Sequence, residues 1–243
     1  IAGMQLTANN LGGAAYSLDK ALSSRPDLLS AQALMAEVEL RQGEPAKAEK
    51  RARDLVLRSP RLAVGHAILG NVAMARNQLP AAIEAYRRAH EIEGGTVSLL
   101  RLFQAMSQQD SGKQALQLAE QWIKVHPKDF LVHKALADGH ARSGNYPSAK
   151  LAYEAALKLK SDDAEVLNNL ANVQLRLKDP GAVKTAEAAM THAPGNALVI
   201  DTLGWALFQN GQTDRALQLL RDARLRQPGN PEIRYHLAVV LAQ

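Results

Sequence analysis

The histidines are the residues of this chain best suited to chemistry, because an imidazole can bind a metal ion or transfer a proton, and the sequence holds seven of them. His133 and His140 are spaced to lie two turns apart on one face of a helix. No carboxylate or thiol completes a metal site around them, and the corresponding places elsewhere are filled by apolar residues such as Ile200 and Leu207. We therefore predict packed histidines and no bound metal.

Other reactive patterns are missing from the sequence. The chain has no cysteine, which excludes disulfides, thiolate metal sites and cysteine nucleophiles. No phosphate-binding glycine loop, nucleophile elbow or spaced carboxylate pair is present, since the glycines near the start (GMQLTANNLGG) have the wrong spacing for a nucleotide fingerprint. We predict that the protein is not an enzyme and that it binds no cofactor.

The charges argue against a nucleic-acid partner. The formal net charge is +5, but the 29 basic residues are spread among 24 acidic ones along the whole length. The densest basic stretch, Lys47 to Arg58, is interrupted by Glu49 and Asp54, as expected for a solvated helix face. No apolar run is long enough to span a bilayer, so we also predict no transmembrane segment.

An internal repeat organises the sequence. A unit of about 34 residues recurs, and most units close on a proline. The closing positions are Pro26, Pro60, Gly94, Pro127, Ser161, Pro194 and Pro228. Small residues recur in the second half of each unit at Ala14, Ala48, Ala82, Ala115, Ala149, Ala182 and Ala216. Large-small pairs recur in the first half, as at Leu69-Gly70 and Leu170-Ala171.

Each unit is predicted to be a pair of antiparallel helices. Apolar residues at helical spacing mark one face of the first helix, and alanine and glycine at fixed places let the two helices approach closely. A residue suited to the left-handed conformation ends the first helix, and a proline suits the first turn of the second. The first set is Gly43, Asn77, Gly144 and Gly211, and the second is Pro45, Pro80, Pro147 and Pro180. One residue is missing at Asp110 to Lys113 and at Lys178 to Gly181, where we expect the turn to be rebuilt.

This layout resembles the tetratricopeptide repeat over essentially the whole chain. The unit Ala63 to Thr96, with AAIEAYRRAHEI in its second half, is the best example, followed by Phe130 to Asp163. The resemblance implies an all-α fold, a right-handed α-α superhelical solenoid of about six to seven helix-turn-helix units. We expect one solenoid over 1–243, a fragment of a longer protein, with partial units at 1–28 and 231–243. Complete units are expected to start near residues 29, 63, 97, 130, 164 and 197.

The resemblance also implies a concave groove lined by the first helices, which binds a protein or peptide partner. The residues that fall at the family's groove positions, and that we expect to contact the partner, are Arg101, Lys134, Asp138, Arg142, Asn168, Asn172, Arg176, Asp201, Trp205, Phe208 and Tyr235. Asn168 and Asn172 could hold a ligand backbone, because an amide both donates and accepts. Arg142 and Arg176 could take a carboxylate between them. Trp205 and Phe208 would form an apolar patch if packing against the last helix does not bury them.

A narrower resemblance is confined to the last two units. The stretches DTLGW (Asp201 to Trp205) and NPEIRYHLA (Asn230 to Ala238) are similar to the C-terminal repeats of bacterial lipoproteins associated with PEP-CTERM and exosortase systems. That likeness implies an exopolysaccharide and protein-sorting system of a Gram-negative bacterium, with the protein in the periplasm or anchored to the outer membrane. Without it, a cytoplasmic location is expected.

Two other roles stay open beside a peptide-binding scaffold. One is a periplasmic scaffold for polysaccharide synthesis and export, which would require exposed aromatic residues such as Trp205 and Tyr235. The other is a structural spacer or self-assembly module, in which exposed terminal helices pair between copies to give a homo-oligomer.

Overall fold

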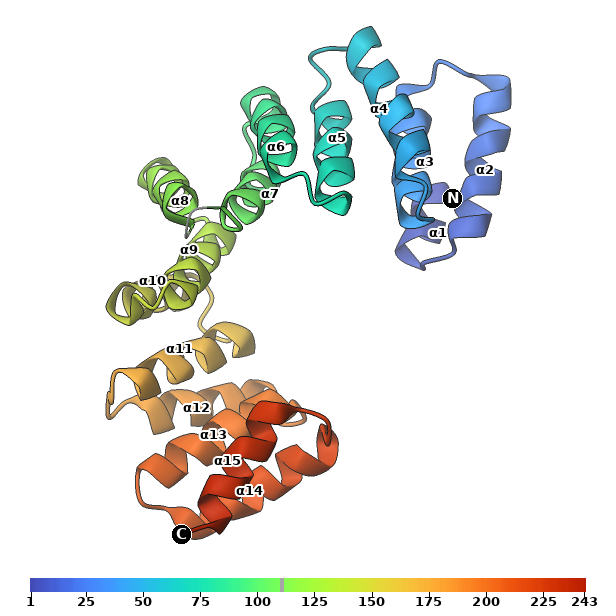
Figure 1. The fold of residues 1–243 in the computed structure, drawn as a ribbon. Coiled ribbons are helices and arrows are strands. Elements are labelled where there is room, and N and C mark those ends of the chain that lie inside the picture. Colours follow the sequence, from blue (N-terminus) through green and yellow to red (C-terminus); the bar gives the residue numbers. More distant parts are fainter. Residues whose placement is uncertain (110–111) are drawn as a thin grey trace. The chain divides into compact units, whose positions relative to one another are not determined.

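The chain folds into helices throughout the part that the structure describes. The computed structural model describes residues 1–109 and 112–243, and every regular element in these ranges is a helix (Figure 1). The predicted all-α solenoid fold is thereby confirmed. No helix in these ranges is long and apolar enough to cross a membrane. Asp110 and Ser111 belong to the first of the two turns that were predicted to lack one residue, and they lie outside the described residues.

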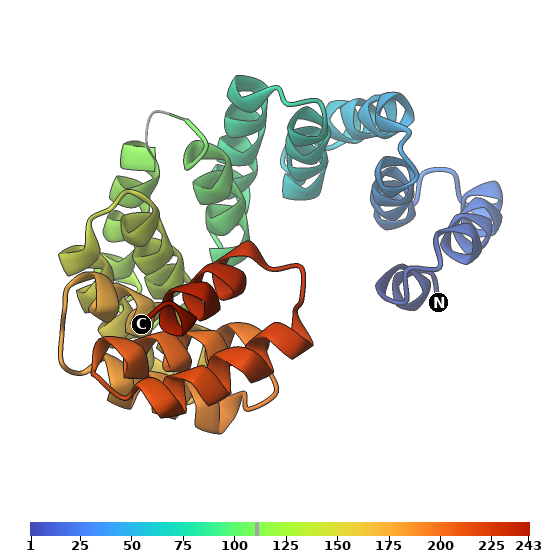
Figure 2. The same cartoon turned by 60° about the horizontal axis from the view of Figure 1, so that its bottom comes forward.

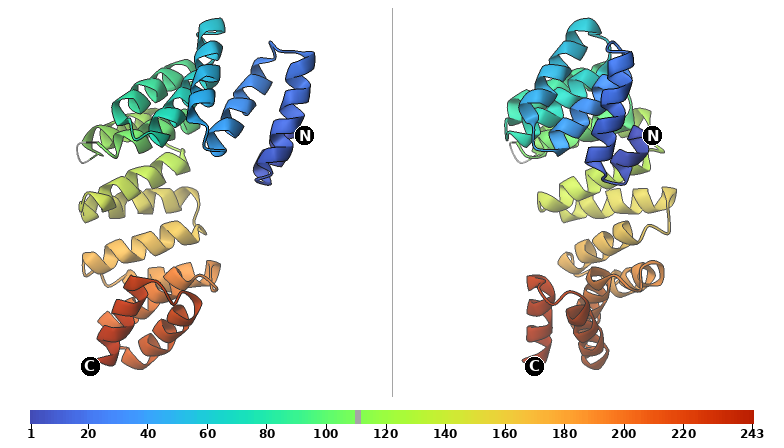
Figure 3. Two further views of the ribbon diagram at one scale, coloured as in Figure 1. Left: turned by 45° about the vertical axis from the view of Figure 1, so that its right-hand side comes forward. Right: turned by 90° about the vertical axis from the view of Figure 1, so that its right-hand side faces the viewer.

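The helices fall into two compact units, 1–118 and 119–243, which are described separately. In the first unit, consecutive helices pack side by side (Figure 3). Its helices are α1 (Ala2–Thr7), α2 (Leu11–Ser24), α3 (Leu29–Arg41), α4 (Pro45–Arg58), α5 (Ala63–Ala75), α6 (Leu79–Glu93) and α7 (Thr96–Met106). The boundary between the units falls within α8 (Lys113–Val125).

The second unit has the same arrangement of paired helices. Figure 2 shows α13, α14 and α15, coloured orange to red, packed together. The helices of this unit are α9 (Phe130–Arg142), α10 (Tyr146–Leu159), α11 (Ala164–Arg176), α12 (Ala182–His192), α13 (Ala197–Gln209), α14 (Thr213–Arg226) and α15 (Pro231–Leu241). The prediction that residues 1–243 form one continuous solenoid stays a prediction.

Small side chains determine how closely the two helices of a pair approach. The recurring alanines of the second helices, from Ala14 to Ala216, are all buried. The helices α5 and α6 approach closely at Gly70, where an added Cβ would lie 2.4 Å from the ring of Tyr86. A Cβ on Gly204 of α13 would likewise lie 2.9 Å from the side chain of Leu220 in α14. Glycine is therefore required at these two places by packing, since a larger residue would force the helices apart.

The turns inside the helix pairs have the predicted left-handed residue. Gly43, Asn77, Gly144 and Gly211 have φ values of 80°, 56°, 77° and 77°. Each lies two residues beyond the end of its first helix, where the left-handed conformation reverses the chain. Pro45, Pro80 and Pro147 occupy the first turn of the following helix, as predicted.

The shortened turn after α11 is rebuilt, as expected, but Pro180 does not occupy the first turn of the next helix as predicted. Lys178 takes the left-handed conformation, with φ 54°, at the place that glycine fills in most of the other pairs. The missing residue is absorbed later, because α12 starts at Ala182 and Pro180 lies in the turn before it instead of inside the helix. Asp179 stabilises this turn by accepting a hydrogen bond from the backbone N–H of Gly181 at 2.8 Å and another from Lys150. The Lys150 ammonium holds the pKa of Asp179 below its usual range.

A side-chain hydrogen bond fastens several first helices to the loop that precedes them. Gln32, His66 and His133 each donate from Nε2 to the backbone carbonyl of the proline six residues earlier. The distances are 2.8 Å to Pro26, 3.2 Å to Pro60 and 3.0 Å to Pro127. We call this contact the proline latch. It gives two of the histidines a structural role that the sequence analysis did not foresee.

Candidate functional site

A polar hollow of about 680 Å³ lies in the second unit and is the main candidate site. Side chains of α9, α10 and α11 form most of it, and α15 contributes one residue. We call it the arginine pocket, and its lining is Asp138, Ala141, Arg142, Tyr146, Tyr153, Asn169, Asn172, Val173, Arg176 and Glu232. Four of the predicted groove residues, namely Asp138, Arg142, Asn172 and Arg176, are therefore brought together.

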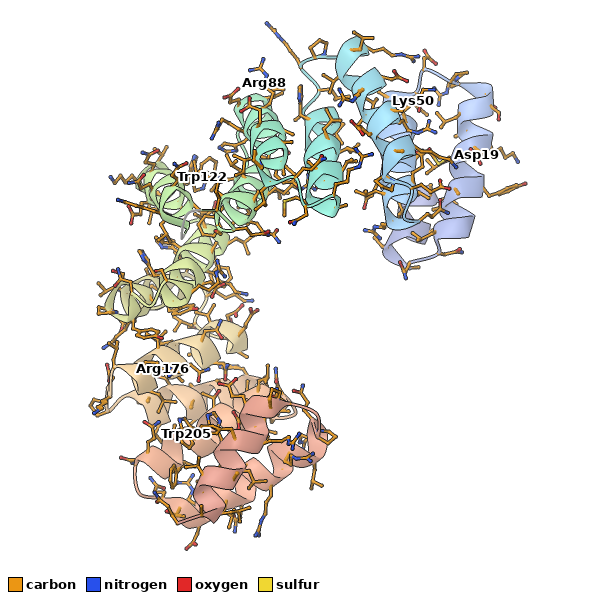
Figure 4. The ribbon with its side chains drawn as sticks, viewed as in Figure 1. Asp19, Lys50, Arg88, Trp122, Arg176 and Trp205 are labelled. Atoms are coloured by element: carbon orange, nitrogen blue, oxygen red, sulfur yellow. The ribbon has the colours of Figure 1, made fainter. Side chains whose placement is uncertain are left out.

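Arg142 and Arg176 are the final residues of α9 and α11 and occupy equivalent places in consecutive helix pairs. Both are exposed, and neither takes part in an ion pair or a hydrogen bond with another described residue (Arg176 is labelled in Figure 4). An unpaired guanidinium presents planar donors that match the two oxygens of a carboxylate. The pocket therefore offers two free cations to an anionic group.

Asp138 is held in place from behind by buried polar groups. The Tyr153 hydroxyl donates to its Oδ1 at 2.5 Å, and the Asn169 side-chain amide approaches the same oxygen at 3.4 Å. Burial and the hydrogen bond to Asp138 raise the pKa of Tyr153, so the phenol stays a donor at neutral pH. Only one oxygen is used by these donors, and Oδ2 remains an acceptor at the pocket.

The two asparagines that were predicted to hold a ligand backbone have different surroundings. Asn172 is exposed and lines the pocket, with its Nδ2 near Thr202 Oγ1 at 3.3 Å. Asn168 is half-buried, and its Oδ1 is enclosed with no hydrogen-bond partner among the described residues. Only Asn172 is placed to reach a ligand in the arginine pocket.

Two other predicted contacts have different surroundings. Lys134 is paired with Glu165, Nζ to Oε2 at 2.5 Å, so its charge is already neutralised within the second unit. Arg101 lies on α7 in the first unit, exposed to solvent. Its part in partner binding stays a prediction separate from the arginine pocket.

The aromatic residues at the end of the chain cluster around a buried polar pair. Asp201 is only 4% exposed, and its Oδ2 accepts a hydrogen bond from Nδ1 of His236 at 2.9 Å. Asp201 is therefore enclosed within the second unit, whereas the sequence analysis expected it among the residues that contact a partner. Trp205 and Phe208 are half-buried, while Tyr235 is 62% exposed. Packing against α15 covers the aromatic patch only in part.

A second hollow, of about 510 Å³, lies in the first unit between α4, α5 and α6 and was not predicted. Its floor is apolar and includes Leu69, Val72 and Ala73 of α5. The cations on its rim are paired within the chain: Glu49 takes hydrogen bonds from Arg53 and Arg76, which lower its pKa. This hollow therefore lacks the free charges that distinguish the arginine pocket.

The histidines do not gather into a metal centre in the described ranges. No cluster of three or more histidine, aspartate or glutamate residues there could hold an ion. His133 serves the proline latch, and Nε2 of His140 lies 3.9 Å from Glu120.

Comparison with known sequences gives one consistent family. A model described as tetratricopeptide repeat matches residues 33–94 and 134–196, and a second model with the same description matches 180–240. No curated protein matches the chain.

Several solved structures have the same fold. PilF of Pseudomonas aeruginosa is 18% identical with a TM-score of 0.69, over 89% of this chain and 99% of that one. The C-terminal part of a repeat protein from Cytophaga hutchinsonii is also 18% identical, with a TM-score of 0.69, over 97% and 98% of the two chains. PilW, a type IV pilus biogenesis factor, is 13% identical with a TM-score of 0.69, over 87% and 99%. These low identities show a shared fold alone.

Proposed function

Because the chain belongs to the tetratricopeptide-repeat family, we propose that it is a protein-binding scaffold whose arginine pocket receives an acidic segment of a partner. The observation that carries this proposal is the presence of Arg142 and Arg176 in one pocket, exposed and unpaired among the described residues. Proteins of this family generally act as non-catalytic scaffolds. No catalytic step is needed to explain the pocket.

The charges of the pocket give the bound segment a direction. A carboxylate is attracted to the two guanidinium groups, whereas Asp138 and Glu232 on other parts of the lining repel it. Asp138 Oδ2 is instead suited to accept a backbone N–H or a cationic group. A segment with its acidic residue at the arginines and a donor at Asp138 therefore satisfies both ends of the pocket.

The cellular setting is a narrower part of the proposal. The similarity of the last two units to exosortase-associated lipoproteins supports a role in a bacterial exopolysaccharide or protein-sorting system at the cell envelope. The fold shared with PilF and PilW does not favour that system, because a fold alone does not specify a function. Fractionation of cells that produce the natural protein tests this, since recovery in the cytosol alone would exclude it. Solution mass measured over a range of concentrations tests pairing between copies.

Capture experiments on charge variants test the pocket. The wild-type chain, an Arg142→Gln/Arg176→Gln variant and a control variant are used to capture proteins from envelope and cytosolic extracts. Lys158→Gln/Arg221→Gln is the matched control, because both side chains are charged, lie on the second helices α10 and α14 and have no described partner. We expect a protein retained by the wild type and the control but lost by the pocket variant, and retention that weakens as salt rises. Capture of the same proteins by the pocket variant, or of none by the wild type, would refute the proposal.

A further inference from the structure

A hydrogen-bonded pair of side chains buried between two helices lies beneath the aromatic cluster of the second unit. His236 of α15 donates from Nδ1 to Oδ2 of Asp201 on α13, and their side chains are 11% and 6% exposed. A buried carboxylate is stable only when donors replace its lost water. Because Oδ1 of Asp201 has no partner among the described residues, the hydrogen bond from His236 is the main compensation. The pair therefore ties α15 to α13 at this point.

The same imidazole forms the support for Trp205. The two rings are stacked, with centroids 4.2 Å apart and planes 13° from parallel. Phe208 and Tyr235 complete an aromatic surface around the indole, with centroids 5.3 Å and 6.4 Å from it. Figure 4 labels Trp205 on α13. Since Asp201 fixes the position of His236, it also fixes the plane against which Trp205 lies.

This aromatic surface continues the arginine pocket. Glu232, which lines the pocket, lies on α15 one turn before Tyr235 and His236. On the other side, Asn172 of the pocket contacts Thr202, which precedes Trp205 on α13. One extended segment could therefore reach both places. Three rings, of which Tyr235 is exposed and Trp205 and Phe208 are half-buried, favour an apolar or aromatic side chain over a charged one.

We propose that Trp205, Phe208 and Tyr235 receive an apolar side chain of the partner segment, and that Asp201 and His236 are positioning residues for this surface. The proposal rests on the proposed function, because it concerns the same bound segment. The occupant is a segment that carries an acidic residue for Arg142 and Arg176 and, a few residues away, an apolar residue for the rings. The charge of the pocket and its continuity with the aromatic surface specify this combination.

Selection from a library of phage-displayed random dodecapeptides on the immobilised full chain tests the ligand chemistry without a known partner. We expect enriched peptides to combine an acidic with an apolar residue. For the enriched peptides made synthetically, Phe208→Ala or Tyr235→Ala should weaken binding by about tenfold, as expected for a contact at the centre of an interface. Leu225→Ala is the control, since Leu225 is 81% exposed on α14, and it should leave affinity unchanged.

Trp205 reports directly on the positioning role. In a Trp122→Phe background it is the sole tryptophan, because the chain has two. We expect His236→Ala to shift the emission of Trp205 and lower peptide affinity at unchanged helix content. His236→Asn, whose amide can still donate to Asp201, should restore part of the affinity. If His236→Ala unfolds the chain, the peptide affinities of His236→Asn, Phe208→Ala and Tyr235→Ala test the proposal instead.

The outcomes separate this inference from the proposed function. Enriched peptides that depend on Arg142 and Arg176 but bind Tyr235→Ala, Phe208→Ala and His236→Asn as they bind the wild type would overturn the inference alone. A library that yields no enriched peptide would overturn both.

Discussion

The hydroxyl of Tyr153 hydrogen-bonds to Oδ1 of Asp138 across the α9–α10 pair, and Tyr86 makes the same bond to Oδ1 of Asn71 across α5–α6, at 2.7 Å. In both pairs a buried tyrosine of the second helix reaches through to a polar residue of the first. Each tyrosine thus anchors the polar residue of the first helix from within the core. Asp138 owes its fixed orientation in the arginine pocket to this contact.

Replacing Tyr153 by phenylalanine removes this anchor with little change in shape. Asp138 then keeps only the longer contact from Asn169, and we expect a loss of about 1–2 kcal/mol in the free energy of unfolding. Urea unfolding at neutral pH measures it. Tyr146→Phe is the control, since its hydroxyl has no described partner. Equal stability of the two variants would show that the Tyr153 bond is not stabilising.

Alkaline pH should weaken the fold through the same tyrosines. Burial raises the pKa of both Tyr86 and Tyr153 above the ordinary value of 10.0, so the folded state binds these protons more tightly than the unfolded state does. The contribution of these two tyrosines to the free energy of unfolding is complete below pH 10 and is lost as pH rises through the folded-state pKa. Urea unfolding between pH 8 and about pH 11 should show falling stability, with a smaller fall in Tyr153→Phe. An identical fall in that variant would contradict the assignment.

A methyl group at Gly70 should separate α5 from α6. The added Cβ would lie 2.4 Å from the ring of Tyr86, so the helices must move, at a cost of about 1–3 kcal/mol. Gly12→Ala is the control, because no atom lies within 4 Å of the new Cβ in α2 and alanine favours a helix. We expect thermal unfolding to show a lower midpoint for Gly70→Ala and no loss for Gly12→Ala. A neutral Gly70→Ala would mean that the packing is looser than the structure shows.

The fold was predictable because its determinants are local and repeated. Small residues such as Ala82 and Ala149, and turn residues such as Gly43, recur at fixed spacing and need no knowledge of distant contacts. Arg142 and Arg176 could be placed together for the same reason, since equivalent places in consecutive pairs are neighbours in space. The caps at Asp129 and Asp163, whose side chains accept backbone N–H bonds, were readable from residue type but were missed.

The remaining features depend on how the side chains of neighbouring helix pairs meet. The partner of Asp201 is His236, 35 residues away, and the spacing alone does not say which side chains of two neighbouring helices will meet. The left-handed Lys178 was missed because lysine gives no local sign of that conformation. The enclosure of Oδ1 of Asn168 likewise depends on which neighbouring side chains surround it, and the spacing does not give that.

The proline latch predicts that glutamine can replace histidine at residue 133. Gln32 already makes this bond to Pro26, so His133→Gln should keep the wild-type stability. His133→Leu retains bulk but removes the donor, and we expect it to lose about 1 kcal/mol. Chemical denaturation of the two variants, compared at equal helix content, measures the difference. Equal stabilities would show that the latch does not stabilise the junction.

Glycine at residue 178 should strengthen the turn between α11 and α12. Lys178 has φ 54°, a conformation that costs a residue with a Cβ about 1 kcal/mol. We therefore expect Lys178→Gly to raise the free energy of unfolding, and Gly144→Lys to lower it at the equivalent turn. Thermal unfolding of both variants gives the comparison. A destabilised Lys178→Gly would imply that the lysine side chain contributes more than its backbone costs.

The short reach of the proline latch affects how a protein of this kind can change over time. Donor and acceptor lie only six residues apart at the three junctions that have the latch, so a duplicated gene segment carries both partners of the hydrogen bond with it. Helix pairs can then be added or removed by recombination without redesign of the neighbouring junctions. The length of the binding surface can therefore change in steps of one helix pair, in evolution or by design.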